Sequence, residues 1–225
     1  MHIMEGFLPL KHAVAWTAAS APFLAAGIWS ARRSLRDHPE RRMLLGVSAA
    51  FSFLLSAMKL PSVTGSCSHP TGVGLGALLF GPLAMVPVSF VVLLFQALLL
   101  AHGGLTTLGA NLFSMGIAGP LMAAAVFRTG RVLRLPLSVN VFLAATLADL
   151  VTYVVTSLQL ALAFPDAISG VAGSMLKFGG IFAVTQIPLA ISEGLLTVLV
   201  VQAMTRLQGE DLRGLPLYAG QEVRA

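Results

Sequence analysis

Two histidines and the N-terminal amine could together chelate a metal ion. The chain opens with Met1 and His2, and His69 lies in the segment Gly65–Gly72. The α-amine of Met1, the amide nitrogen of His2 and its ring Nδ1 can close fused chelate rings around one ion once the amide loses its proton. A ring nitrogen of His69 could then supply a fourth ligand in the same plane.

A plane of four nitrogens favours particular ions. It suits Ni(II), Cu(II) and, less rigidly, Co(II), and it fits tetrahedral Zn(II) or oxygen-seeking Mg(II) poorly. The residues leave a plainer alternative open, in which His2 is a surface residue beside the initiator and His69 is an ordinary loop residue. The metal site therefore requires that the fold bring the two segments together.

Three further polar residues could line such a site. Cys67 stands two residues before His69 and could be a soft ligand, although a thiolate would change the geometry and the reversibility of binding. His102 and Asn111 could contact a ligating imidazole from outside, since such a ring normally donates its other N–H to an acceptor. For His102 the alternative is a helix-end residue at the outer interface.

Two carboxylates, Asp149 and Glu193, fall deep inside apolar segments. Ionisable groups are costly within a membrane and usually functional there. The alternative for each is a neutral carboxyl that only fixes helix packing, and the sequence does not name a partner for either.

The composition indicates the elements that must position these residues. Hydrophobic residues make up 56% of the 225 residues and charged residues 10%, and residues 60–127 contain no Asp, Glu, Lys or Arg. An ordinary soluble domain has roughly 25% charged residues, so we predict an all-α, polytopic membrane protein. The net charge of +5 then sets orientation rather than nucleic-acid binding.

The arginines fall in three groups, which the positive-inside rule assigns to the cytoplasm. The chain must then cross an odd number of times between the outer loop that carries His69 and the second, cytoplasmic arginine group, which requires a short glycine-rich crossing after His69. This predicts seven spans, with the N-terminus outside and the C-terminus cytoplasmic. The spans are Ala13–Ala31, Met43–Leu60, Val73–Met85, Val86–Ala101, Leu105–Phe127, Leu137–Phe164 and Gly180–Met204.

The alternative for the segment Val73–Met85 is a re-entrant loop, which would invert everything after it. We predict one transmembrane metal-binding domain over residues 1–204, with residues 1–9 as an N-terminal plug, and a cytoplasmic tail over residues 205–225. Residues Gly170–Phe178 are expected to form a separate interfacial helix from which Lys177 reaches the lipid head groups.

Three segments resemble the substrate-binding membrane component of energy-coupling-factor cobalt/nickel transporters, the CbiM/NikM family. They are Met-His-Ile-Met-Glu-Gly-Phe-Leu-Pro at the start, Ser-Cys-Ser-His-Pro-Thr-Gly at residues 66–72, and His-Gly-Gly-Leu-Thr-Thr-Leu-Gly-Ala-Asn at residues 102–111. The similarity extends into residues 185–194. It implies a seven-helix fold in which the metal is held by Met1, His2 and His69, and it favours the cobalt branch.

The resemblance also implies partners and a cellular role. They are a transmembrane coupling subunit, two cytoplasmic ATP-binding subunits and a small accessory membrane protein, working in the inner membrane of a bacterium to import Co(II) for cobalamin biosynthesis. The chain has no G-x-x-x-x-G-K-[ST] motif, so ATP hydrolysis is expected in other subunits. Nickel(II) uptake is the nearest alternative, because the nitrogen plane accepts either ion.

A function of another class remains open at this point. A metal-dependent membrane enzyme could use His2 and His69 with Asp149 or Glu193 as acid or base. Such an enzyme would need an open coordination position on the metal, whereas a closed plane of four nitrogens would count against it. We expect no prosthetic group, and the metal ion is expected as cargo.

Overall fold

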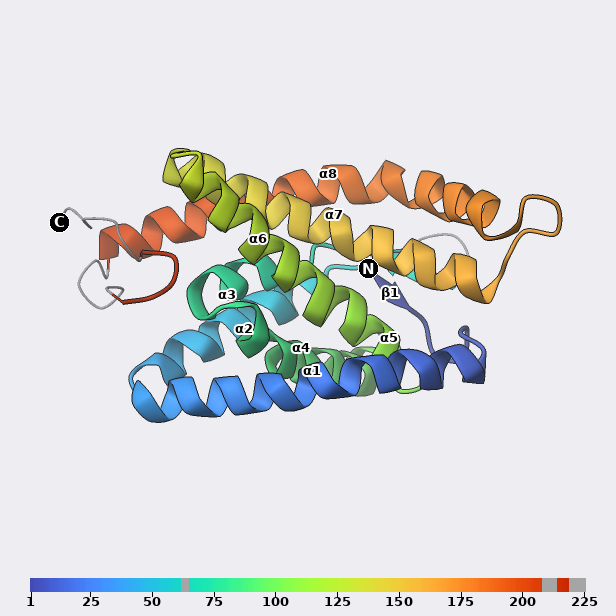
Figure 1. Cartoon of the computed structure of the whole chain (residues 1–225), viewed down its shortest axis with the longest axis horizontal. Helices are drawn as coiled ribbons and strands as arrows, with labels where there is room; N and C mark the ends of the chain where they lie inside the picture. The colour runs from blue at the N-terminus through green and yellow to red at the C-terminus, as the bar shows by residue number, and fades with distance from the viewer. Residues whose placement is uncertain (62–64, 208–213, 219–225) are drawn as a thin grey trace.

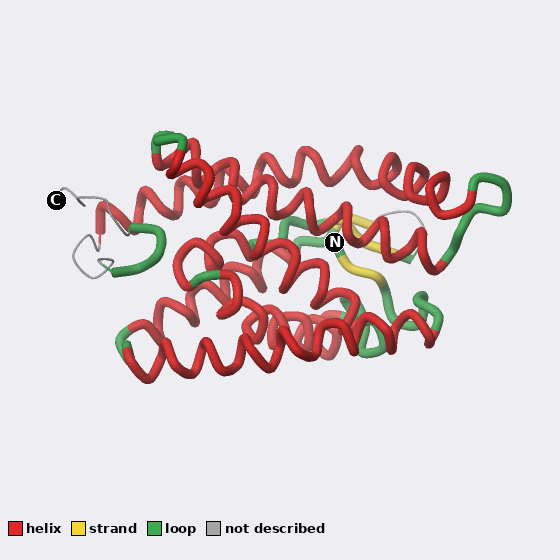
Figure 2. The backbone as a smooth tube through the Cα atoms, viewed as in Figure 1, coloured by secondary structure: helices red, strands yellow, loops and turns green. Residues whose placement is uncertain are grey.

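The computed structural model describes residues 1–61, 65–207 and 214–218, and its long helices lie side by side (Figure 1). Short strands lie among these helices (Figure 2). The helices are α1 (Leu10–Asp37), α2 (Arg41–Ala57), α3 (Val73–Phe80), α4 (Pro82–Leu100), α5 (Leu108–Asn111), the π-helical η1 (Leu112–Ala118), α6 (Gly119–Val132), α7 (Leu137–Ala163) and α8 (Gly170–Leu207).

Five helical stretches among the described residues are long and apolar enough to cross a membrane. They are α1, α4, the continuous run from α5 to α6, α7 and α8. The other two helices are shorter: α2 has 17 residues and α3 has 8, so at 1.5 Å per residue α3 is only about 12 Å long. A helical, multi-pass membrane protein is confirmed, while the count of seven spans and the orientation stay predictions.

The glycine-rich segment after His69 is divided differently from the predicted crossing Val73–Met85. Helix α3 ends at Phe80 because Gly81 has a φ of 87°, and Pro82 begins α4. A positive φ suits glycine, and proline suits the first turn of a helix, where its missing N–H costs nothing. Met85 therefore belongs to α4.

Other predicted boundaries shift by a few residues. Helix α2 ends at Ala57, and Leu60 lies in a strand rather than at the end of the predicted span. The predicted span Leu105–Phe127 becomes helical only at Leu108. The predicted first and sixth spans agree closely with α1 and α7.

The last helix corrects the predicted interfacial segment. Residues Gly170–Phe178 continue without a break into the predicted span Gly180–Met204, and together they form the 38-residue helix α8. Lys177 pairs with Asp166, in the turn before α8, instead of extending towards head groups. A separate interfacial helix is therefore wrong, because the intervening glycines keep helical backbone.

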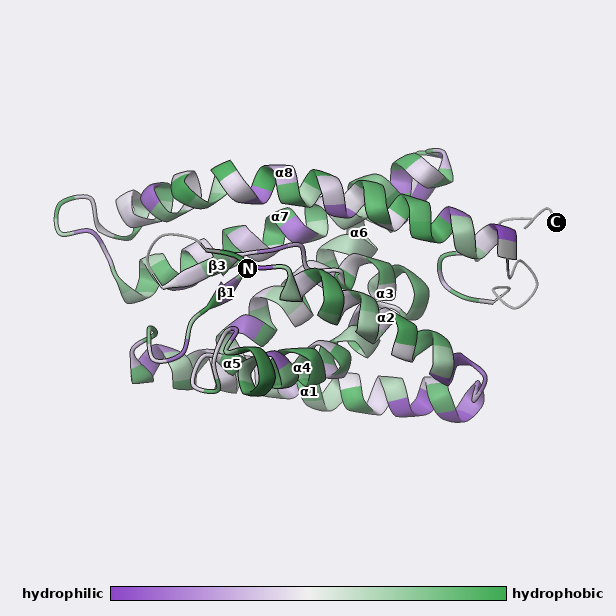
Figure 3. Ribbon diagram, turned by 180° about the vertical axis from the view of Figure 1, so that it is seen from behind, coloured by the Kyte–Doolittle hydropathy of each residue, from purple (hydrophilic) through white to green (hydrophobic). Residues whose placement is uncertain are grey.

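One end of the bundle collects the chain segments that carry the arginines. The end of α1 with the start of α2, the end of α6 with the start of α7, and the end of α8 all lie at the end where the C-terminus is found (Figure 1). Hydrophilic residues gather there, whereas hydrophobic residues cover much of the helices between the two ends (Figure 3). The described arginines of the first two groups, and Arg206 of the third, thus share one end of the fold.

A small antiparallel sheet lies towards the opposite end of the bundle. It contains β1 (His2–Ile3), β2 (Leu60–Pro61) and β3 (Ser66–Ser68), in the order β1-β3-β2. Extended backbone among apolar helices needs partners for its N–H and C=O groups, and the sheet supplies them. Strand β3 thus leads into the short helix α3, with which the predicted third crossing begins.

The C-terminal residues 214–218 pack against the arginine-bearing end. Leu215, Leu217 and Tyr218 are buried with residues of α3 and α8, and the Tyr218 hydroxyl lies 2.8 Å from Thr205 Oγ1. Of the predicted tail 205–225, residues 205–207 belong to α8, and residues 208–213 and 219–225 lie outside the described residues.

Candidate metal centre

The sheet brings the N-terminus into the interior of the bundle. Strand β1 pairs with β3 so that His2 lies opposite Cys67 and Ile3 opposite Ser66. Met1, His2 and Ile3 are fully buried. The first three residues of the chain are therefore enclosed within the bundle, and a plug over residues 1–9 stays a prediction.

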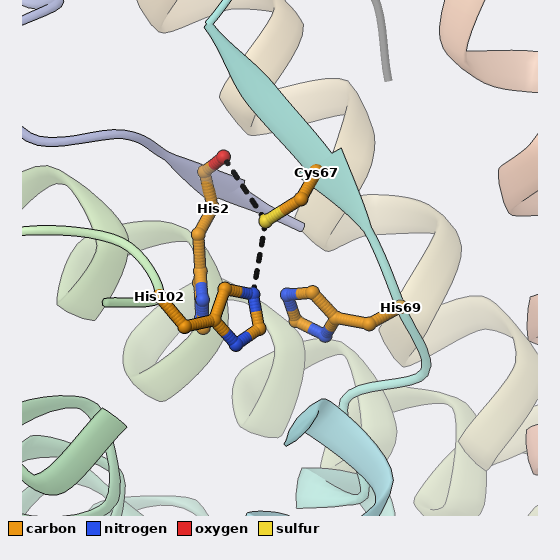
Figure 4. Close-up of side chains that lie close together, drawn as sticks. All are labelled: His2, Cys67, His69 and His102. Atoms are coloured by element: carbon orange, nitrogen blue, oxygen red, sulfur yellow. Dashed lines mark hydrogen bonds between the residues drawn. The ribbon is translucent and has the colours of Figure 1, made fainter. Parts of the chain in front are cut away.

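Four metal-binding side chains meet beside this plug. His2, Cys67, His69 and His102 each offer a ligand atom, and these atoms lie within 4.8 Å of one another (Figure 4). The ring centroid of His2 is 4.3 Å from that of His69 and 4.6 Å from that of His102. The fold thus joins all three histidines that the sequence singles out, together with the single cysteine.

The tautomer of His2 is set by a residue that sequence reasoning missed. Its Nε2 lies 3.3 Å from the thioether sulfur of Met115, while its Nδ1 has no hydrogen-bond partner among the described residues. Met115 belongs to the π-helical turn η1, and such turns are frequent at functional sites. The sequence gives no sign of this role for Met115, because the residues around it do not reveal the π turn or the contact with His2, which is 113 residues away.

His69 is oriented by its own loop. Its Nδ1 donates to the carbonyl of Pro70 at 2.8 Å, which leaves the buried Nε2 without a partner among the described residues. This hydrogen bond places the proton on Nδ1 and a lone pair on Nε2. The free nitrogens of His2 and His69 are therefore both acceptors, the state that a metal ion requires.

His102 and Cys67 contact each other within the cluster. The Cys67 sulfur lies 2.9 Å from His102 Nε2, and His102 is 2% exposed. His102 is thus part of the pocket rather than a surface residue at a helix end. Burial raises the pKa of the Cys67 thiol, against an opposing effect of the Met1 amine, so the thiol is protonated in the empty site.

Asn111 holds the plug rather than an imidazole. Its Oδ1 accepts from the Ile3 amide at 2.8 Å, and its Nδ2 donates to the Ile3 carbonyl at 3.0 Å. Thr107 donates to the same carbonyl at 2.8 Å. The loop before Thr107 also approaches the segment after β1 closely, since a Cβ on Gly104 would lie 2.5 Å from the Cα of Glu5.

The two buried carboxylates support the segment that carries His69. Glu193 accepts hydrogen bonds from the backbone amides of Thr71 and Gly72, directly before α3. Its carboxyl oxygens therefore supply acceptors for backbone amides at the N-terminus of α3, where such groups lack partners within the helix.

Asp149 acts through a glutamine. Gln186 donates to both oxygens of Asp149 at 2.8 Å and also to the carbonyl of His69 at 3.0 Å. Neither carboxylate belongs to the cluster of metal-binding side chains. Both positions were singled out by the sequence, but their partners come only from the fold.

Burial adjusts the protonation of the candidate ligands. It lowers the pKa of the Met1 amine, although Asp149, Cys67 and Glu193 oppose this effect. It also lowers the pKa values of His2 and His69 well below the usual value, and the Met1 amine and His102 act in the same direction. The pKa of His102 falls to about 4, chiefly through burial. Burial thus shifts all four groups towards the neutral form that metal ligation requires.

A family comparison identifies the chain. Residues 2–210 match the family described as "Cobalt uptake substrate-specific transmembrane region", CbiM. The chain belongs to the CbiM family. This confirms the family resemblance on which the sequence-based ligand set rests.

Curated CbiM relatives cover the whole chain. It is 64% identical over 226 residues to "Cobalt transport protein CbiM 2" of Pelobacter propionicus, with 100% of both chains covered. It is 62% identical over 212 residues to "Cobalt transport protein CbiM" of Streptomyces coelicolor, covering 94% of this chain and 91% of that one. This CbiM-family chain is therefore a membrane transport component rather than an enzyme, and the enzymatic alternative is set aside.

Two solved structures share the CbiM-family fold described above. A truncated transition metal transporter superposes with a TM-score of 0.78 at 25% identity, covering 92% of this chain and 99% of that one. A second transition metal transporter gives a TM-score of 0.81 at 24% identity, covering 94% and 96%.

Proposed function

We propose that this protein is the substrate-capture component of a cobalt(II) importer. The ion is held in one plane by the Met1 amine, the amide nitrogen and Nδ1 of His2, and Nε2 of His69. The observation that carries the proposal is a pair of buried ring nitrogens that have no hydrogen-bond partner in the described part of the chain, each on an imidazole whose other nitrogen is already engaged. Both rings thus face the site with the correct tautomer before any metal arrives.

The buried N-terminal residues isolate a captured ion from water. Because Met1 and His2 are fully buried, an ion bound to them is removed from water, and its exchange requires β1 to move. Asn111 and Thr107 hold β1 through the backbone of Ile3. Capture at the outer face and release on the cytoplasmic side then require a conformational change, which the chain itself cannot drive.

Partner subunits supply that drive in our proposal. The chain carries no ATP-binding loop motif, so a transmembrane coupling subunit and two cytoplasmic ATP-binding subunits are expected, with a small accessory membrane protein. The complex lies in the bacterial inner membrane and supplies cobalt for cobalamin biosynthesis. Membership of the cobalt uptake family supports this assignment.

Nickel(II) is the second candidate substrate. Planar nitrogen ligands suit Ni(II) at least as well as Co(II), so the ligand chemistry does not separate the two ions. The curated relatives named above are cobalt transport proteins, and this favours cobalt.

The test is a competitive Co(II)/Ni(II) titration of the purified protein, with and without a capped N-terminus. Acetylating the Met1 amine removes one ligand and should abolish binding of both ions. A His38→Ala variant is the matched control, because His38 lies in the exposed turn after α1 and outside the cluster. Equal affinity in the capped and uncapped proteins would disprove the chelate.

A further inference from the structure

Two metal-binding side chains in the cluster are not used by the proposed cobalt chelate. Cys67 and His102 lie 2.9 Å apart through Sγ and Nε2, and both are buried. His69 and His2 belong to the same cluster, and their buried Nε2 and Nδ1 atoms have no hydrogen-bond partner among the described residues. Figure 4 shows the side chains of Cys67, His69 and His102 converging in front of His2.

The spacing of these atoms is close to that of a tetrahedral site. Zinc lies about 2.0–2.1 Å from nitrogen and about 2.3 Å from sulfur, which places tetrahedral ligand atoms about 3.3–3.6 Å apart. The four ligand atoms here lie within 4.8 Å of one another. Closing around an ion therefore requires the most distant pair to approach by about 1.3 Å, a movement that side-chain rotation can supply.

The tautomers also suit such an ion. His2 and His69 already present unprotonated nitrogens, and His102 accepts at Nε2 if the Cys67 thiol donates to it. One sulfur and three imidazoles form a ligand set that zinc prefers, and it needs no deprotonated backbone amide. The only proton to leave is that of the Cys67 thiol, which passes to water as the sulfur–metal bond forms.

We infer that the cluster has a second binding mode, in which zinc(II) is held tetrahedrally by Cys67, His69, His102 and His2. This mode shares His2 and His69 with the proposed cobalt chelate. Only its consequence, that zinc competes with cobalt, rests on the proposed function. Zinc in this mode ties β1, β3 and the segment after α4 together. The plug cannot then move, so zinc blocks uptake without being transported.

The experiment titrates the full-length protein in detergent with Zn(II), with Co(II), and with Cd(II) as a spectroscopic probe of thiolate ligation. The wild-type protein should show an ultraviolet sulfur-to-cadmium charge-transfer band, and Zn(II) should displace Co(II). In Cys67→Ser the band should vanish, and zinc affinity should fall by at least about tenfold, a loss seen even for residues outside the ligand shell. Cobalt affinity should stay within about threefold, which also shows that the variant is folded.

A second variant, His102→Gln, should weaken zinc and spare cobalt in the same way. Absence of the charge-transfer band in the wild-type protein would overturn the inference, and so would equal losses of zinc and cobalt affinity in Cys67→Ser. If the wild-type protein binds zinc through Cys67 but shows no cobalt chelate, the proposed function fails and the zinc mode stands. The two failures are therefore distinguishable.

Discussion

At the scale of single residues, His2 and His69 each have one ring nitrogen in a hydrogen-bond contact outside the cluster. The other ring nitrogen of each is left for the cluster. His2 is set by Met115 and His69 by the carbonyl of Pro70. These contacts fix the tautomer and the orientation of each ring before metal binds. Because less conformational freedom is then lost on binding, we expect a higher metal affinity. The contact to Met115 is the one that a variant can test directly.

Replacing Met115 by Leu should weaken Co(II) binding about tenfold, the lower range for loss of an outer partner of a metal-bound histidine. Leu has a similar volume and keeps the core packing, but it cannot accept a hydrogen bond from His2. Isothermal titration of the purified variant measures the change. Met85→Leu is the matched control, since Met85 is equally buried and packs in the same hydrophobic core as Met115, and a loss of the same size in both would refute a specific role.

The pH dependence of metal binding should differ from that of a free Met-His-Ile peptide. Burial lowers the pKa values of the Met1 amine and of His2 in the folded protein. A lowered pKa means that the binding-competent neutral form persists to lower pH. The peptide should lose metal as the pH falls through its amine and imidazole pKa values, about 8 and about 6.5, and the protein should lose metal at lower pH. Coincident midpoints in pH titrations of both would contradict this.

At the scale of elements, the proposed function requires β1 to move relative to the segments that hold it. Asn111 and Thr107 bind the backbone of Ile3, and Glu193 fixes the start of α3 after the His69 loop. The side chains that hold β1 are therefore separate from those that hold His69, so the two halves of the site can be weakened independently.

The variant Asn111→Leu should loosen β1 and weaken Co(II) binding by about ten- to a hundredfold. It removes both Asn111 hydrogen bonds to Ile3 and leaves the buried Ile3 amide without this acceptor, at a cost of about 1–3 kcal/mol, while Thr107 still donates to the Ile3 carbonyl. Metal titration measures the affinity, and protease cleavage near the N-terminus reports release of the plug. Gln202→Leu on α8 is the control, and an Asn111→Leu protein with unchanged affinity and protection would argue against this role.

At the scale of the whole molecule, the C-terminal residues close the end of the bundle opposite the sheet. Leu215 and Leu217 are buried in the same cluster as Leu75 and Leu78 of α3. Helix α3 begins directly after the His69 loop, so it connects the metal centre with the arginine-bearing end. The C-terminal segment is thus part of the folded core at that end.

Leu217→Ala should destabilise the protein by about 2–5 kcal/mol, because it leaves a cavity around a fully buried side chain. Pro216→Ala, at the exposed neighbouring position, should have little effect. Thermal unfolding in detergent compares the two. Equal melting temperatures would show that residues 214–218 do not contribute to the core.

The sequence by itself determined the class of protein and the donor atoms. Residues 60–127 without charge require a membrane interior, and Met1, His2 and His69 supply nitrogens of the correct kind. These properties depend only on side-chain chemistry and on helix length, which are local.

Only the tertiary structure decided how the donors meet. The pairing of His2 with Cys67, the contact of Met115, and the roles of Asn111 and Glu193 all join segments far apart in the chain. Buried backbone N–H and C=O groups need hydrogen-bond partners whatever the neighbouring side chains are. The residues of one segment therefore do not indicate which distant segment will supply those partners.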